Sequence, residues 1–149
     1  MNPKFHKYFM EVAYVTAELS NARRLKVGCV AVLDRRIICC GYNGTAPGED
    51  NNCETEMADG TLVTKSNVFH AEINLIMFSK KHNISLEGCS LYLTHEPCEP
   101  CGIELARTGI IEVIADNAYT GSNPNSRGKL GSILNLKVGN YLQFTEGGL

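Results

Sequence analysis

The sequence predicts an α/β fold in which one mixed sheet is flanked by helices. Segments with helical spacing of apolar residues alternate with short apolar, β-branched runs, and two of these runs are separated only by a tight turn. Strands that alternate with helices pair in parallel, whereas two strands joined by a tight turn pair antiparallel. No repeat, low-complexity tract or linker divides the 149 residues. We therefore expect residues 1–149 to form a single domain.

The first half of the chain predicts one helix and one hairpin. Apolar side chains recur near the helical period over residues 4–19. The apolar runs 27–33 and 37–42 flank Asp34-Arg35 and predict two strands joined by a turn. The stretch 43–67 is polar and long for a connection, and connections of that length are usually functional or disordered.

The second half of the chain predicts alternating helices and strands. Helices are expected at 70–81 and 97–109, and strands at 89–94 and 110–115. Proline at position 97 suits the first turn of its helix. The segment 130–136 is either a last helix or irregular.

Composition excludes several classes of protein. The net charge is -2, which argues against a protein that mainly grips nucleic-acid backbone, although Arg23, Arg24 and Lys26 form a local basic group. No apolar run reaches the roughly 18 residues of a membrane span, and none near the start resembles a signal-peptide core. We expect no nucleic-acid or membrane partner and a reducing, cytoplasmic location.

Cysteine usage points to metal chemistry. The chain has seven cysteines, and two of them, Cys98 and Cys101, form a Cys-x-x-Cys pair after a proline. In a reducing compartment this pattern indicates a metal site or catalytic thiols rather than disulfides. Four other cysteines lie in apolar runs and are expected to be small core residues: Cys29, Cys39, Cys40 and Cys89.

Two short motifs together predict a catalytic zinc site. His70 opens one predicted helix, and Cys98 and Cys101 share one side at the start of another. Zn²⁺ accepts imidazole and thiolate ligands in a tetrahedral site, and a catalytic site keeps its fourth position for water. Glu72, two residues after His70, is placed to move protons of that water. We expect one Zn²⁺ per chain.

Structural alternatives exist for each motif. A structural zinc site needs a fourth ligand, for which Cys53 and His95 are the nearby candidates. Glu72 alone could be an acidic residue matched to a helix dipole. His-x-Glu followed by Pro-Cys-x-x-Cys is, however, the known signature of zinc-dependent nucleobase deaminases.

With these motifs the chain resembles the cytidine deaminase superfamily, most closely its deoxycytidylate (dCMP) deaminase family. The resemblance covers nearly the whole length, and Gly41-Tyr42-Asn43-Gly44 separates this family from most relatives. The segment Asn117-Ala118-Tyr119 departs from the Lys-Tyr that the family often has there. The other segments that carry the resemblance are Val27–Val30, Phe69–Asn74, Gly88–Tyr92, Pro97–Cys101 and Gly109–Val113.

The resemblance implies a three-layer fold with a five-stranded sheet and hydrolysis of dCMP to dUMP, which supplies thymidylate synthesis. It also implies a hexamer that dCTP activates, with Mg²⁺ accompanying this effector, and that dTTP inhibits. Deamination of another cytosine or adenine compound, or a zinc-stabilised module without activity, are the alternatives.

The resemblance further implies contacts for the substrate and the effectors. The substrate contacts would come from Asn43, the backbone amide of Ala71, Tyr119 and, for the phosphate, Lys26; Asn43 could instead be only a turn residue. An effector site is expected around the 43–67 loop and the following helix, near a subunit boundary, where Phe78 could equally be a packing residue. Its candidate residues are Gly41, Tyr42, Gly44, Phe78 and Lys81.

Overall fold

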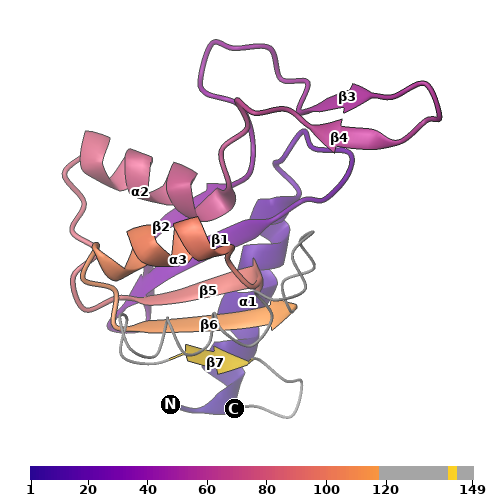
Figure 1. The fold of residues 1–149 in the computed structure, drawn as a ribbon. Helices are drawn as coiled ribbons and strands as arrows, with labels where there is room; N and C mark the ends of the chain where they lie inside the picture. The colour runs from indigo at the N-terminus through magenta and orange to yellow at the C-terminus, as the bar shows by residue number, and fades with distance from the viewer. Residues whose placement is uncertain (118–140, 144–149) are drawn as a thin grey trace.

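The computed structural model describes residues 1–117 and 141–143, and within them the chain forms three layers. A five-stranded mixed sheet has the order β2-β1-β5-β6-β7, with α1 on one face and α2 and α3 on the other (Figure 1). The elements are α1 (Pro3–Ala17), β1 (Gly28–Leu33), β2 (Arg36–Tyr42), β3 (Glu54–Glu56), β4 (Leu62–Thr64), α2 (Ala71–Lys81), β5 (Ser90–His95), α3 (Glu99–Ala106), β6 (Glu112–Asn117) and β7 (Tyr141–Gln143). This arrangement confirms the predicted fold class.

Helix α1 begins where the sequence provides a cap. The Asn2 side chain accepts a hydrogen bond from the amide of Lys4, and Pro3 occupies the first turn, where its missing N–H costs nothing. The buried face of α1 includes Phe9 and Met10, which pack on β1, β5 and β6. None of the helices in the described ranges is long and apolar enough to cross a membrane.

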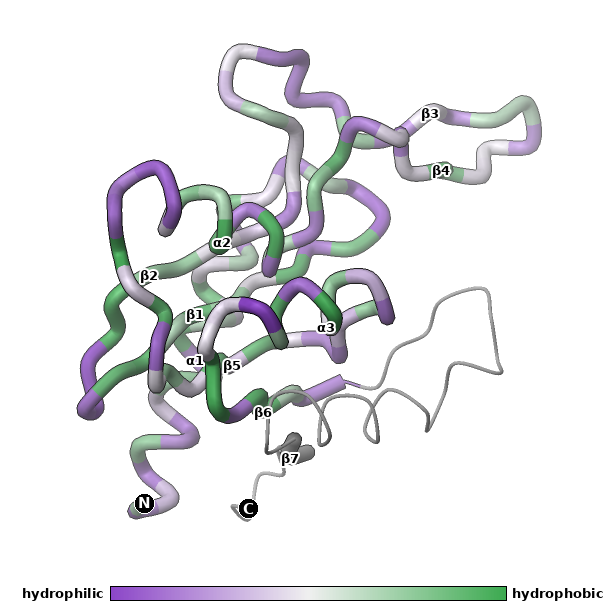
Figure 2. The backbone as a smooth tube through the Cα atoms, turned by 60° about the vertical axis from the view of Figure 1, so that its left-hand side comes forward, coloured by the Kyte–Doolittle hydropathy of each residue, from purple (hydrophilic) through white to green (hydrophobic). Residues whose placement is uncertain are grey.

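The predicted hairpin is present, and its turn has the conformation that suits antiparallel strands. Asp34 and Arg35 have φ of 49° and 59°, and two successive positive values define the mirror-image turn whose twist matches the flanking strands. The strand β1 is buried on both faces: Cys29 and Ala31 face α2 and α3, whereas Val30 faces α1. Figure 2 shows the resulting run of hydrophobic residues along β1.

Two glycines allow the helices to lie directly on the sheet. A Cβ atom at Gly28 would lie 2.2 Å from the carbonyl oxygen of Ala13 in α1. A Cβ atom at Gly41 would lie 2.4 Å from the carbonyl oxygen of Ala71 in α2. Both distances are shorter than any real Cβ contact, so only glycine fits. Gly41 therefore fixes how closely the first turn of α2 approaches β2.

The structure differs from expectation in three places. The 43–67 stretch contains a two-stranded hairpin, β3–β4, that projects from the body of the molecule (Figure 1). Strand β7 was not expected from the residue pattern, because three residues are too few to show a period. Cys40 is exposed and not a core residue: it lies on the edge strand β2, while its neighbour Cys39 faces α2. The other three predicted core cysteines are buried. The segment 130–136 lies outside the described residues.

Candidate active site

Two helix starts meet beside the carboxyl end of β5. His70 is the N-cap of α2 and Cys98 is the N-cap of α3, and both have extended backbones, with ψ of 160° and 165°. Cys98 follows β5 after a short turn, whereas a bridge between Gly44 and Phe69 delivers the chain to His70. The carboxyl ends of parallel strands are the usual place for ligand sites in sheets of this kind.

The three predicted ligands come together with the spacing of a tetrahedral metal site. The Nδ1 atom of His70 lies 3.3 Å from Sγ of Cys101 and 3.4 Å from Sγ of Cys98. All three ligand atoms lie within 4.8 Å of one another. Zn–S bonds of about 2.3 Å and Zn–N bonds of about 2.0 Å at tetrahedral angles separate ligand atoms by about 3.6 Å. The donor set and its spacing therefore fit Zn²⁺.

Neither candidate for a fourth protein ligand belongs to this group. Cys53 is buried and its thiol faces the carbonyl of Asn51, at 3.4 Å, while Nδ1 of His95 lies 2.9 Å from the hydroxyl oxygen of Thr94. Among residues 1–117 the metal-ligand group contains His70, Cys98 and Cys101 alone. A set of three ligands, of which His70 is exposed, favours an open, catalytic site over a closed structural one.

The neighbouring groups shift the pKa values of the two cysteines in opposite directions. The hydrogen bond from the Cys101 thiol, together with His70, lowers the pKa of Cys98 to about 4. The same hydrogen bond and burial raise the pKa of Cys101. Two neighbouring thiols that compete for one proton hold it between them, and metal binding releases it.

Glu72 is a buried carboxyl group in the first turn of α2. Its side chain is 3% exposed, and Oε2 has no hydrogen-bond partner among the described residues. Burial raises its pKa to about 7. A buried polar atom without a partner is costly, and a group that titrates near neutrality suits proton transfer at that pH. The position of Glu72 therefore matches a role toward a ligand rather than toward the fold.

The residues predicted to contact substrate are partly engaged in the fold. Asn43 uses its amide to hold the segment before β1: Oδ1 accepts from the amide of Val27 and Nδ2 donates to the carbonyl of Leu25, each at 2.8 Å. One donor and one acceptor position of that amide remain. Lys26 is exposed and lies 3.8 Å from Glu18.

Two further predicted contacts complete this set. Ala71 is fully buried at the start of α2, where the first backbone amides of a helix have no partner within it. Tyr119 lies outside the described residues.

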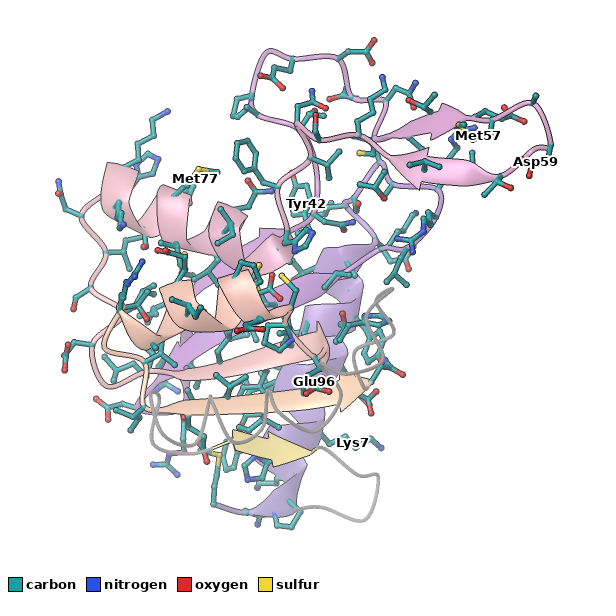
Figure 3. The ribbon with its side chains drawn as sticks, viewed as in Figure 1. Lys7, Tyr42, Met57, Asp59, Met77 and Glu96 are labelled. Atoms are coloured by element: carbon teal, nitrogen blue, oxygen red, sulfur yellow. The ribbon has the colours of Figure 1, made fainter. Side chains whose placement is uncertain are left out.

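The candidate effector residues occupy two separate places. Gly41, Tyr42 and Gly44 flank the start of α2, and the Tyr42 carbonyl accepts a hydrogen bond from Asn74. Figure 3 shows Tyr42 beside this first turn and Met77 further along the helix. The other two candidates, Phe78 and Lys81, belong to the last turns of α2, about 10 Å along the axis at 1.5 Å per residue.

Phe78 has a neighbour of its own. It is 50% exposed, and its ring lies 4.3 Å from that of His82. Half of its surface therefore remains open, so the packing interpretation holds only in part.

A polar cluster at the ends of β5 and β6 was not predicted. Asn117 donates to the carbonyl of Thr94 and to the hydroxyl of Tyr14, each at 2.7 Å, and that hydroxyl donates to Asp116. Burial, and then the hydrogen bond to Asp116, raise the pKa of Tyr14 to about 12. The cluster fixes the carboxyl end of β6 against α1 and β5. The one sequence signal for it was the departure from the family pattern at Asn117.

The three-layer fold and this His/Cys/Cys group define the class of zinc-binding deaminases. The model of the cytidine and deoxycytidylate deaminase zinc-binding region matches residues 3–116. The chain belongs to this family, which confirms the resemblance noted from the sequence.

Several curated relatives of this chain are deoxycytidylate deaminases. A deoxycytidylate deaminase of Schizosaccharomyces pombe is 32% identical over 78% of this chain, and that of Mycobacterium phage D29 is 34% identical over 75%. The chain spans 38% of the length of the S. pombe enzyme and 94% of that of the phage enzyme. The chain thus matches part of the S. pombe enzyme and nearly the whole length of the phage enzyme.

Solved structures agree with this assignment. The dCMP deaminase of cyanophage S-TIM5, solved in complex with dCMP and dUMP, superposes with a TM-score of 0.83 and 30% identity, covering 97% of this chain and 99% of that one. A tRNA:A34 deaminase superposes with a TM-score of 0.61 and 23% identity and shares the fold alone.

We predict about one Zn²⁺ per chain in the purified protein, measured by atomic emission or mass spectrometry. Cys98→Ser and His70→Ala should each lose most of the bound metal, because each removes one of three ligands. Cys40→Ser should retain it, since Cys40 is exposed on the edge strand. A content near two per chain would instead reveal a second site that uses Cys53 or His95.

Proposed function

We propose that this chain is a hydrolytic deaminase that converts dCMP and water to dUMP and ammonia. The observation that carries the proposal is the buried carboxylate oxygen of Glu72, which has no hydrogen-bond partner in the described part of the chain and lies beside three metal-ligating side chains. The similarity to a cyanophage dCMP deaminase solved with dCMP and dUMP supports this choice of substrate. The product dUMP would supply thymidylate synthesis, and the whole chain would act as one domain.

Glu72 moves the protons in the proposed mechanism. His70, Cys98 and Cys101 would hold Zn²⁺, whose chemistry would be to lower the pKa of a water from about 16 to about 7 and so to make it nucleophilic at neutral pH. Glu72 accepts a proton from the attacking water and delivers it to ring nitrogen N3 of cytosine, as the new oxygen bonds to C4. It then transfers the second proton of the same water from the new C4 hydroxyl to the exocyclic nitrogen, which leaves as ammonia. A carboxyl group can act in both directions of transfer, because it accepts a proton as a carboxylate and donates one as an acid.

The neighbouring groups would orient the nucleotide. The backbone amide of Ala71, at the start of α2, would donate to the base carbonyl. The remaining donor and acceptor of Asn43 would bind a sugar hydroxyl. Lys26 would contact the phosphate, and Tyr119 would contribute to the sugar or phosphate site.

We expect ammonia release from dCMP to exceed that from deoxycytidine, cytosine and an RNA by about tenfold or more. A hydrogen bond to a charged group contributes about 1.5–3 kcal/mol, which corresponds to at least that factor when the phosphate is absent. The assay compares kcat/KM for all four compounds under one condition. Faster turnover of the nucleoside or of RNA would assign the chain to another branch of the family.

Glu72→Ala should retain zinc and the fold but lose dCMP turnover by about a hundredfold or more, because a positioned acid/base contributes about 100- to 10,000-fold. Metal content, thermal unfolding and ammonia release are measured on the same preparation. Glu99→Gln is the matched control, since Glu99 is the exposed acid in the first turn of α3. Turnover that survives in Glu72→Ala would refute the assigned role, and wild-type protein without turnover would favour a zinc-stabilised module.

We also propose that the chain forms a hexamer that dCTP, with Mg²⁺, activates and dTTP inhibits; membership of the family supports this proposal. A dCMP titration with each triphosphate should shift the half-saturating concentration in opposite directions, and coupling of about 1–3 kcal/mol gives about a 5- to 150-fold change. Phe78→Ala and Lys81→Ala should reduce the shift if the end of α2 contributes to the effector site. A hyperbolic curve that neither triphosphate moves would show that the chain lacks this regulation.

A further inference from the structure

A short basic segment, Arg23–Lys26, connects α1 to β1 and presents three exposed cationic side chains. It ends two residues before Gly28, whose amide donates to the hydroxyl of Thr94 at 3.1 Å. Asn43 contacts the same segment and precedes Gly44, which pairs with Phe69 next to the ligand His70. The basic segment is thus tied to the elements that deliver the metal ligands.

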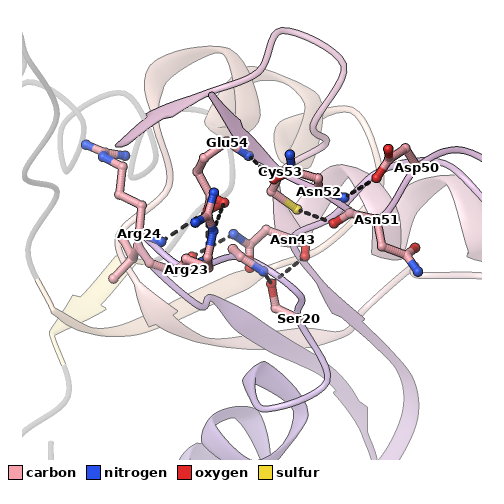
Figure 4. A network of polar contacts seen from close by, with 11 residues as sticks. Ser20, Arg23, Arg24, Asn43, Asp50, Asn51, Asn52, Cys53 and Glu54 are labelled. Carbon is pink, nitrogen blue, oxygen red and sulfur yellow. Dashed lines mark hydrogen bonds and ion pairs between the residues drawn. The ribbon is translucent and has the colours of Figure 1, made fainter. Parts of the chain in front are cut away.

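Glu54, the first residue of β3, holds the basic segment from the other side. Its Oε1 accepts hydrogen bonds from the backbone amides of Arg23 and Arg24, at 2.7 and 3.1 Å (Figure 4). Its Oε2 lies 3.9 Å from Nε of Arg23 and has no hydrogen-bond partner among the described residues. The Glu54 side chain is 1% exposed. Two backbone amides and one guanidinium therefore converge on one buried carboxylate.

A buried carboxylate is a costly way to hold a loop. A neutral acceptor would satisfy the same two amides without the cost of desolvating a charge. What the negative charge adds is the attraction for Arg23, which remains an ion pair at 3.9 Å and not a hydrogen bond. Within residues 1–117 the ion pair with Glu54 involves Nε of Arg23, and the two terminal guanidinium nitrogens would bind an anion in the planar, two-pronged way that phosphate favours.

Charge distribution agrees with an anion site at the segment itself. Residues 49–64 contain five acidic residues and no basic one, whereas the whole chain has a net charge of -2, so the remainder carries +3. The exposed acids of the hairpin, Glu56 and Asp59, would repel an anion, whereas Arg23–Lys26 would attract it. Arg23 lies beside Glu54 and Lys26 lies 3.8 Å from Glu18, whereas the Arg24 side chain extends away from Glu54 in Figure 4.

We propose that Glu54 is a positioning residue that holds Arg23–Lys26 in the conformation that binds the phosphate of the nucleotide substrate. This inference rests on the proposed function. Glu54 acts through the backbone of residues 23 and 24 and through the Arg23 side chain, and it does not touch the reacting atoms.

The test distinguishes an effect on phosphate binding from an effect on the rest of the substrate. Glu54→Gln should raise KM for dCMP about tenfold while kcat stays within about twofold, and kcat/KM for deoxycytidine should not change. Inhibition of dCMP turnover by inorganic phosphate should weaken by a similar factor, which provides a measurement if the nucleoside is turned over too slowly. Glu56→Gln is the matched control: Glu56 lies two residues further along β3 and is exposed.

A double variant tests whether Glu54 acts through Arg23. Arg23→Gln should raise KM for dCMP, and Glu54→Gln in that background should add much less than it does alone, since coupled residues are not additive. Equal losses for dCMP and deoxycytidine, or unchanged kinetics, would overturn the proposal. Wild-type protein that deaminates neither compound would instead refute the proposed function.

Discussion

The close packing of α2 against β2 is the constraint on which the site depends. Three ligand atoms from two helix starts must lie within 4.8 Å, so both starts need fixed positions. Gly41 leaves no space for a side chain against the carbonyl of Ala71, one residue after the ligand His70. The parallel pairing of β5 with β6 fixes the other start, because Cys98 follows β5 directly. A small shift at Gly41 would therefore move one ligand relative to the other two.

Two buried carboxylates frame the proposed nucleotide site. In the described part of the chain, Glu54 and Glu72 are the two residues with a buried side-chain oxygen that lacks a hydrogen-bond partner. Folded proteins rarely leave such atoms unpaired without a functional reason. Glu72 lies beside the metal ligands and Glu54 beside the basic segment. The two buried carboxylates thus lie where the base and the phosphate of one nucleotide would bind.

Sequence patterns predicted the longer helices and strands, in which a period can be recognised, and the residues with distinctive chemistry. The helices and the Asp34-Arg35 turn follow from local spacing, whereas the His70, Cys98 and Cys101 group follows from the motif that the chain shares with zinc-dependent deaminases. The β3–β4 hairpin did not, because its three-residue strands show no period. Glu54 was missed for a different reason: its role depends on contacts with residues 30 positions away, which a polar loop does not reveal.

The 43–67 connection contacts both parts of the proposed substrate site. At one end Asn43 holds the backbone of the basic segment, and Gly44 pairs with Phe69 beside the ligand His70. In its middle Glu54 binds the same basic segment. A long loop closes at little extra entropic cost, but its backbone polar groups need partners, and here those partners come from the segments that would bind base and phosphate. The order of the connection and the order of these two segments therefore depend on the same hydrogen bonds.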